Sequence, residues 1–306
     1  MNPALQSVPA GTGRDAAPWH MPEEHTPLYH TAIYSQLTYA QRGSYNRLNA
    51  LYFHEQIYFF ERVLAGSLIG PFLDPPIAAS LPSGLGDGLR AFVEEENEHS
   101  EMFLQLNRDC APSLYTHRDF FFISAPRSVL RLMQSMASHP FRFPLFLWLA
   151  HLMEERALYF SKCFLNRADS IDRRFVEAQR RHLADEIGHV RCDHELIRLV
   201  WPATPGWLRS LNVRLLSWMI GELFSAPKRS GLRVVSEWIK LHPELRPLLP
   251  GITKGMRALG SDRAYLQTLY HRGNIPMTLG LFDQWPEFKC MESVMPAYQW
   301  NGKNAG

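Results

Sequence analysis

The sequence lacks a long apolar stretch. Its longest apolar run, residues 143–153, is interrupted by Pro144 and His151 and is much shorter than the roughly 20 residues that a membrane-spanning helix needs. Residues 1–20 also lack the basic segment followed by an apolar segment that forms a secretion signal. We therefore expect a cytoplasmic protein with no membrane partner, in which residues 1–26 form a flexible tail.

The sequence also has little excess of one charge over the other, and few cysteines. The 32 basic and 30 acidic residues are spread along the chain and give a formal net charge of +2, so no basic stripe indicates a nucleic-acid partner. The four cysteines lie far apart without a C-x-x-C pair, which argues against a disulfide framework or a zinc site. Iron–sulfur spacings and a G-x-G-x-x-G after a predicted strand are absent too. Any oxidation chemistry would therefore need electrons from outside the chain: from an external donor, either a reductase or a small reductant, or from the partly oxidised substrate.

Helical patterns fill most of the sequence. No segment shows sustained strand alternation, and proline or glycine separates the long helical patterns, which predicts an all-α fold. The predicted long helices span residues 39–68, 89–109, 144–166 and 173–200, with a short helix at residues 127–137. With 46% hydrophobic residues, the chain has enough apolar surface for one large core. We expect a single all-α domain over residues 27–306, with a bundle core at about 39–202 and a helical extension at 203–306.

Four of these helices carry carboxylates and histidines in a distinctive order. The order is Glu61, then Glu96-x-x-His99, then a glutamate, then Glu186-x-x-His189, which is the ligand order of di-iron sites in four-helix bundles. Because one Glu-x-x-His pair is expected by chance, the position of each pair is the better test. Helical wheels place both pairs at the centre of the apolar side of their helices. Buried carboxylates are costly unless a cation compensates them, so the pattern predicts two bound metal ions.

The pattern does not decide which glutamate of the predicted helix at residues 144–166 is the ligand. Glu154 and Glu155 have equally apolar neighbours at helical spacing, and periodicity does not choose between them. His54 and His151 also lie near the expected ligand faces, but we interpret them as hydrogen-bonded core histidines. In the first helix, Glu55 falls on the side of Arg62, where it would be solvated or paired.

The ligand spacing resembles that of the p-aminobenzoate N-oxygenase family, ferritin-like di-iron enzymes that oxidise amines to hydroxylamine, nitroso or nitro products. The matching residues are Glu61, Glu96, His99, Glu155, His182, Glu186 and His189. The most specific element is His182, an additional histidine one turn before the last Glu-x-x-His. The family's spacing also favours Glu155 over Glu154. The resemblance covers roughly residues 29–201 and implies a ferritin-like four-helix bundle core with additional C-terminal helices.

This resemblance implies a non-haem di-iron monooxygenase of secondary metabolism. It would hold two iron ions, use O2 as co-substrate and N-oxygenate a small amine. Asp185, beside Glu186, is expected either to orient His99 or to be an ordinary surface acid. A homodimer is among the expected assemblies.

Two other functions remain open at this stage. One is a di-iron hydroxylase or desaturase that acts on a carbon centre, with a carrier-bound substrate as one case; the other is a non-catalytic ferritin-like metal-binding protein. The substrate is equally open, because Trp148, Tyr159 and the aromatic run 120–122 would line an arylamine pocket or simply belong to the core.

Overall fold

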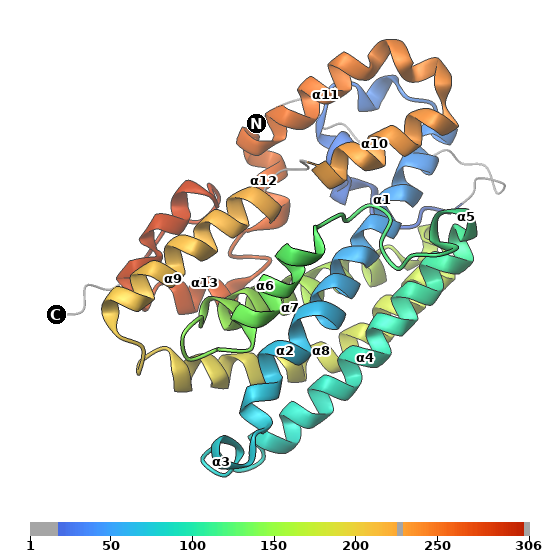
Figure 1. The fold of residues 1–306 in the computed structure, drawn as a ribbon. Helices are drawn as coiled ribbons and strands as arrows, with labels where there is room; N and C mark the ends of the chain where they lie inside the picture. Colours follow the sequence, from blue (N-terminus) through green and yellow to red (C-terminus); the bar gives the residue numbers. More distant parts are fainter. Residues whose placement is uncertain (1–17, 225–228, 303–306) are drawn as a thin grey trace.

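The computed structural model describes residues 18–224 and 229–302, and these form helices and connecting loops without a strand (Figure 1). Its α-helices are α1 (Tyr39–Phe59), α2 (Gly66–Ile69), α3 (Pro75–Ala78), α4 (Leu85–Cys110), α5 (Pro112–Tyr115), α6 (Arg127–Ala137), α7 (Leu145–Asn166), α8 (Arg173–Val200), α9 (Gly206–Met219), α10 (Arg229–Leu241), α11 (Leu249–Ala258), α12 (Arg263–Leu269) and α13 (Pro276–Phe282). Within the described residues, no helix is both long enough and apolar enough to span a bilayer. The predicted all-α fold is confirmed.

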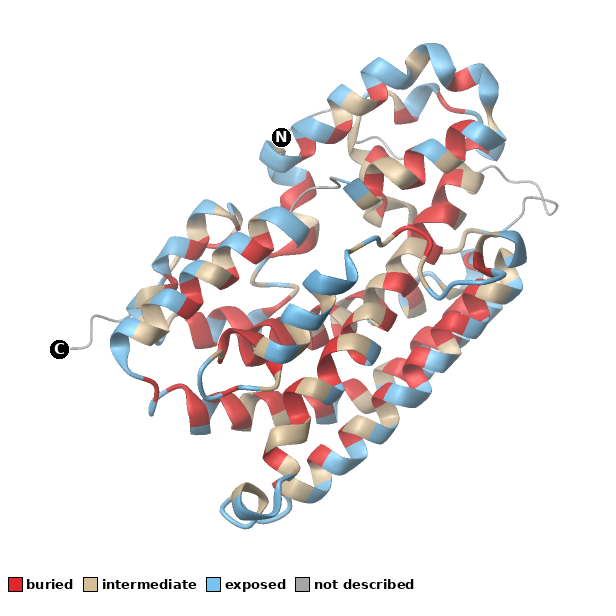
Figure 2. Ribbon diagram, in the orientation of Figure 1, coloured by how far each residue is buried: buried red, intermediate tan, exposed pale blue. Residues whose placement is uncertain are grey.

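Four long elements form the core bundle: α1 with its continuation into α2, α4, α7 and α8. Helix α8 packs against both α7 and α4, and α4 also packs against α1. Figure 2 shows buried residues running along these helices on the sides that face one another. On α4, Leu89, Phe92 and Phe103 are almost completely buried, because they recur at the spacing of one helix face.

Local hydrogen bonds explain where the bundle helices begin. Thr38 and Gln41 form a reciprocal capping box at the start of α1, and Asp172 accepts a hydrogen bond from the backbone N–H of Arg174 at the start of α8. Helix α4 begins at Leu85, four residues before the predicted start at residue 89. Gly86 and Gly88 lie inside the helix, where a side chain at Gly88 would come within 3.2 Å of the Cys192 sulfur.

The first bundle helix is not a regular α-helix throughout. Residues Phe60–Ala65 form a π-helical turn, after which the chain continues into α2. A second π-helical turn, Ile220–Phe224, follows α9. Such turns insert an extra residue into a helix and occur frequently at functional sites.

The C-terminal helices form an extension that packs on the bundle. Helix α10 packs against α1, whereas α9 and α13 pack against α7. The α7 residue Trp148 lies within an aromatic cluster that includes Phe282 and Phe288 of the extension. The extension is therefore helical, as predicted.

The N-terminal segment differs from the expected tail over residues 1–26. Trp19 donates a backbone hydrogen bond to Ser170, and Asp172 donates one back to Trp19. Met21 and Thr26 are buried. Residues 18–26 thus pack on the bundle through contacts with distant segments that local composition does not reveal, while residues 1–17 lie outside the described part of the chain.

Candidate metal centre

The interior of the bundle brings buried carboxylates and histidines together in two overlapping groups. The groups are Glu61, His99, His182 and Glu186, and Glu96, His99, Glu186 and His189. Within each group, one possible ligand atom from every residue lies within 4.8 Å of the others. His99 and Glu186 belong to both groups. These two residues therefore link the two groups into one cluster.

Short distances converge on Glu186. Its Oε1 lies 3.0 Å from Nε2 of His182 and 3.3 Å from Nδ1 of His189. His182 Nε2 also lies 3.0 Å from Oε1 of Glu61, and His189 Nδ1 lies 3.0 Å from Oε1 of Glu96. These five residues come from three segments of the bundle that are distant in sequence.

Two of the histidines form hydrogen bonds with carboxylates outside the two groups. His99 Nε2 donates a hydrogen bond to Asp185 at 3.1 Å, and His189 Nε2 donates one to Glu95 at 2.9 Å. Each imidazole therefore carries its proton on Nε2 and turns the lone pair of Nδ1 toward the cluster. Of the two roles left open for Asp185, the structure shows the contact with His99.

Glu95 was missed from the sequence, although a signal for it exists. It precedes Glu96, just as Asp185 precedes Glu186. Both motifs therefore read acid-Glu-x-x-His, and the first acid of each one contacts the histidine of the other.

The third helix presents Glu154, not Glu155, to this cluster. The Glu155 carboxylate accepts hydrogen bonds from the backbone N–H groups of Met277 and Thr278, both at 2.7 Å, at the start of α13. Glu154 is buried beside Glu186. The expectation for Glu155 is thus corrected, because the extension supplies its partners and the bundle pattern alone does not show them.

The electrostatics of the cluster call for a cation. Burial raises the pKa of Glu61 to about 7 and that of Glu96 to about 8. Burial, and then the nearby Glu186 and Glu96 carboxylates, raise the pKa of Glu154 well above its usual range. Burial acts in the opposite direction on His182, but Glu186 and Glu61 together outweigh it and raise the histidine pKa to about 10. So many buried carboxylates remain ionised at low cost only when metal ions replace the protons.

Buried oxygen and nitrogen atoms without a hydrogen-bond partner also indicate a site for a cation. Both carboxylate oxygens of Glu96 and of Glu186 are buried without a hydrogen-bond partner, as are Nδ1 of His99 and of His189. Buried polar atoms are normally satisfied. Carboxylate oxygens and imidazole nitrogens in this combination are the donors of carboxylate-bridged di-iron sites. The residues therefore fit two metal ions.

Two other histidines near the cluster form hydrogen bonds with residues outside it. His54 Nδ1 lies 3.0 Å from Oδ1 of Asn107, and His151 Nδ1 lies 2.8 Å from the Thr278 hydroxyl. Both histidines are completely buried. Their interpretation as hydrogen-bonded core residues is confirmed.

A cavity of about 590 Å³ reaches the cluster, where Glu61, Glu154 and His182 form part of its wall. Its aromatic lining consists of Tyr52, Phe53, Phe59, Phe60, Phe160 and Trp218. Trp148, Tyr159 and residues 120–122 are not among the lining residues. The size and aromatic walls suit a small, largely apolar ligand.

One wall of the cavity is the loop at residues 123–126, and Glu55 anchors it. The Glu55 carboxylate accepts hydrogen bonds from the backbone N–H groups of Phe121, Phe122 and Ile123 and from the Tyr115 hydroxyl. Glu55 is 1% exposed. The expectation that Glu55 would be solvated or paired on the side of Arg62 is therefore wrong, because its carboxylate is buried among backbone groups that the helical wheel does not reveal.

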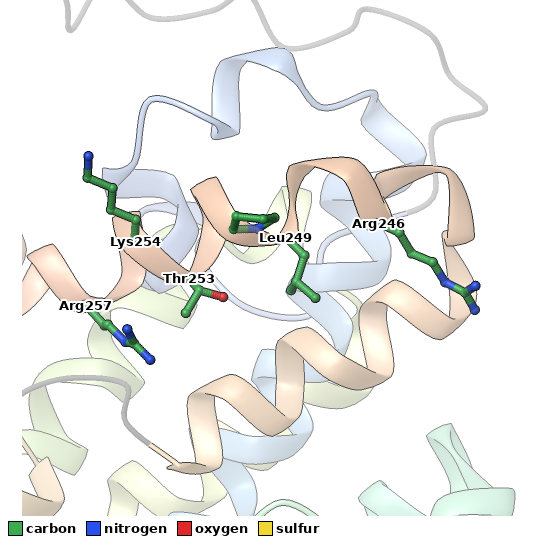
Figure 3. A pocket seen from close by; sticks show the side chains of 6 residues that line it. Arg246, Leu249, Thr253, Lys254 and Arg257 are labelled. Carbon is green, nitrogen blue, oxygen red and sulfur yellow. The ribbon is translucent and has the colours of Figure 1, made fainter.

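A second hollow lies away from the cluster, on α11 and the turn before it. Its lining residues are Arg246, Leu249, Pro250, Thr253, Lys254 and Arg257. Figure 3 shows that the charged ends of Arg246, Lys254 and Arg257 point away from one another. They do not converge on a common ligand position, and no residue of the buried cluster takes part.

A four-helix bundle with this fold and this cluster defines a ferritin-like protein suited to hold metal ions. The chain belongs to the family described as P-aminobenzoate N-oxygenase AurF, which it matches over residues 8–236. Its members are oxygenases. No curated protein matches the chain.

Proposed function

We propose that this protein is a di-iron monooxygenase that transfers an oxygen atom from O2 to the nitrogen of a small amine. The observation that carries the proposal is the buried carboxylate–histidine cluster at the wall of an aromatic cavity, in a chain of this oxygenase family. Two irons would supply the activation of O2, which protein side chains do not provide.

Seven residues would hold the two irons. They are Glu61, Glu96, His99, Glu154, His182, Glu186 and His189, with Glu154 in the place first expected for Glu155. Glu186 and His99 belong to both donor groups, so their side chains would serve the site as a whole. Glu95 and Asp185 would keep His189 and His99 in the orientation that binding requires.

His182 distinguishes this site from one with two Glu-x-x-His pairs alone. Its Nε2 lies 3.0 Å from both Glu61 and Glu186, and it lines the cavity. A neutral imidazole adds a nitrogen donor without adding negative charge. We propose that it tunes the reactivity on the side of the site that the substrate meets.

The overall reaction determines how many electrons and protons must be supplied. One oxygen atom of O2 enters the new N–O bond and the other leaves as water, which consumes two electrons and two protons. The electrons would come from an external donor, a reductase or a small reductant. The family description makes p-aminobenzoate the first amine to test, and a role in secondary metabolism goes with that substrate class.

The test is a product assay on reduced, iron-loaded protein mixed with 18O2 and a panel of amines that includes p-aminobenzoate. Mass spectrometry should find labelled hydroxylamine, nitroso or nitro products. Glu186→Ala, which removes the shared carboxylate, should give none. Label on carbon would instead identify a hydroxylase, and iron oxidation without any organic product would identify a metal-binding protein.

A further inference from the structure

The π-helical turn Phe60–Ala65 carries one carboxylate of the cluster. Glu61 lies in this turn, and its Oε1 lies 3.0 Å from Nε2 of His182. The π-helix is rare in proteins, so a regular α-helix is the ordinary alternative for these residues. Contacts with other segments are therefore expected to stabilise the turn.

The turn also determines the direction of the Glu61 side chain. A π-helical turn contains one extra residue, and one residue corresponds to about 100° of rotation in an α-helix. With the extra residue, Glu61 faces the cluster while Leu68 and Ile69, which follow the turn, are buried in the core. A regular helix over the same residues would rotate Glu61 by roughly 100° relative to those two side chains.

One side chain from another segment reaches the backbone of this turn. Gln134 of α6 donates a hydrogen bond from Nε2 to the carbonyl oxygen of Val63, at 3.1 Å. Helix α6 packs against the turn and against α2, which continues from it. Among the described residues, no other side chain outside the turn forms a hydrogen bond with its backbone.

The position of Gln134 distinguishes it from its polar neighbours. Gln134 is half-buried, whereas Arg131 and Ser135 of the same helix are exposed. The other polar contact of the turn, between the side chains of Arg62 and Asn97, is exposed as well. A hydrogen bond shielded from water is electrostatically stronger than one on the surface. The contact from Gln134 is therefore the one best placed to hold the turn.

We propose that Gln134 is a positioning residue of the metal centre, whose hydrogen bond to Val63 stabilises the π-helical turn and so directs Glu61 toward the bound metal. Gln134 belongs to neither donor group and does not line the cavity, so it acts only through the backbone of the turn. This inference rests on the proposed metal centre and not on the identity of the amine.

The test uses Co²⁺, whose visible absorption spectrum depends on the number and arrangement of its ligands, with the full-length protein and without O2 or amine. Gln134→Met keeps a side chain of similar length without charge but removes the donor. It should alter the Co²⁺ spectrum and weaken Co²⁺ binding by about twofold to tenfold, the range of one neutral hydrogen bond. Arg131→Met, on the exposed side of α6, should match the wild type. Equal changes in both variants, or none in Gln134→Met, would overturn the proposal.

A double-mutant cycle shows whether Gln134 acts through Glu61. Glu61→Ala removes the carboxylate that the turn positions, so adding Gln134→Met to it should cause no further change in the Co²⁺ spectrum. A further change as large as that in the wild-type background would mean that Gln134 influences the site by another route, and would refute this role.

Amide hydrogen exchange on the metal-free protein examines the turn directly. Gln134→Met should accelerate exchange at residues 60–65, and Arg131→Met should not. Unchanged exchange in Gln134→Met would mean that other contacts hold the turn, which also refutes the role.

These readouts separate this inference from the proposed function. If the wild type binds no Co²⁺, the metal centre itself is refuted, and this role of Gln134 with it. If Gln134→Met behaves as expected but no N-oxygenated product forms from any amine, the inference stands and the reaction must be revised.

Discussion

At the scale of single residues, we predict that Glu95 and Asp185 support iron binding through their hydrogen bonds to His189 and His99. Glu95→Ala or Asp185→Ala should each weaken iron binding about tenfold to a hundredfold, the usual effect of losing an acceptor behind a ligating histidine. Competition with a chelator measures the affinity. Glu94→Ala is the matched control, because Glu94 is exposed and adjacent to Glu95. If all three variants behave alike, the hydrogen bonds to His99 and His189 do not influence the site.

The two glutamates of α7 give a second prediction. Glu154→Ala should lose bound iron, because it removes a carboxylate beside Glu186. Glu155→Ala should retain iron and instead lower the free energy of unfolding by about 1–3 kcal/mol, since two backbone N–H groups lose their acceptor. Metal analysis and urea unfolding distinguish the two, and the opposite pattern would return the ligand to Glu155.

Single residues of the site could be predicted from the sequence where a motif repeats on one helix face. They could not be predicted where contacts with a distant segment determine which side chain faces the cluster. The two Glu-x-x-His pairs and His182 meet in the structure because each set lies on one helix face. The decision between Glu154 and Glu155 depends on α13, more than a hundred residues away. No periodicity within α7 contains that contact.

At the scale of elements, the loop that forms one cavity wall depends on Glu55. Glu55→Ala leaves three backbone N–H groups without their buried acceptor, each of which costs about 1–3 kcal/mol. Amide hydrogen exchange should accelerate at residues 121–123 and the protein should lose stability. The exposed Glu101 provides a control in Glu101→Ala, and unchanged exchange in Glu55→Ala would show that other contacts hold the loop.

Helix boundaries were predictable because their signals are local. Prolines, capping residues and apolar spacing placed α6 and α8 at their observed bounds. The π-helical turn around Glu61 was not predictable, because the wheel assumes a constant 3.6 residues per turn. The loop that covers Glu55 was not predictable for another reason, because its backbone groups lie 66–68 residues away in the sequence.

At the scale of the whole molecule, buried histidines make stability sensitive to acid. Burial lowers the pKa of His54 and of His151 to about 3, from an ordinary value of 6.5. Below pH 6.5 the unfolded chain binds protons that the folded protein excludes, so stability is full above that pH and is lost as the pH falls toward 3. Together the two histidines should lower the free energy of unfolding by about 4 kcal/mol between pH 8 and pH 5.

Urea unfolding of wild type and His54→Gln at several pH values checks this estimate. The variant should lose about half of the histidine contribution, since one of the two titrating side chains is gone. A variant with the same pH dependence as the wild type would mean that His54 does not titrate on unfolding.

The cavity touches Glu61, Glu154 and His182, whereas His189 lies behind them with the ring of Phe92 stacked on it at 4.1 Å. The cluster therefore has a front that faces the cavity and a back that the ring of Phe92 covers. A guest in the cavity meets Glu61, Glu154 and His182, and it is separated from His189 by the cluster itself.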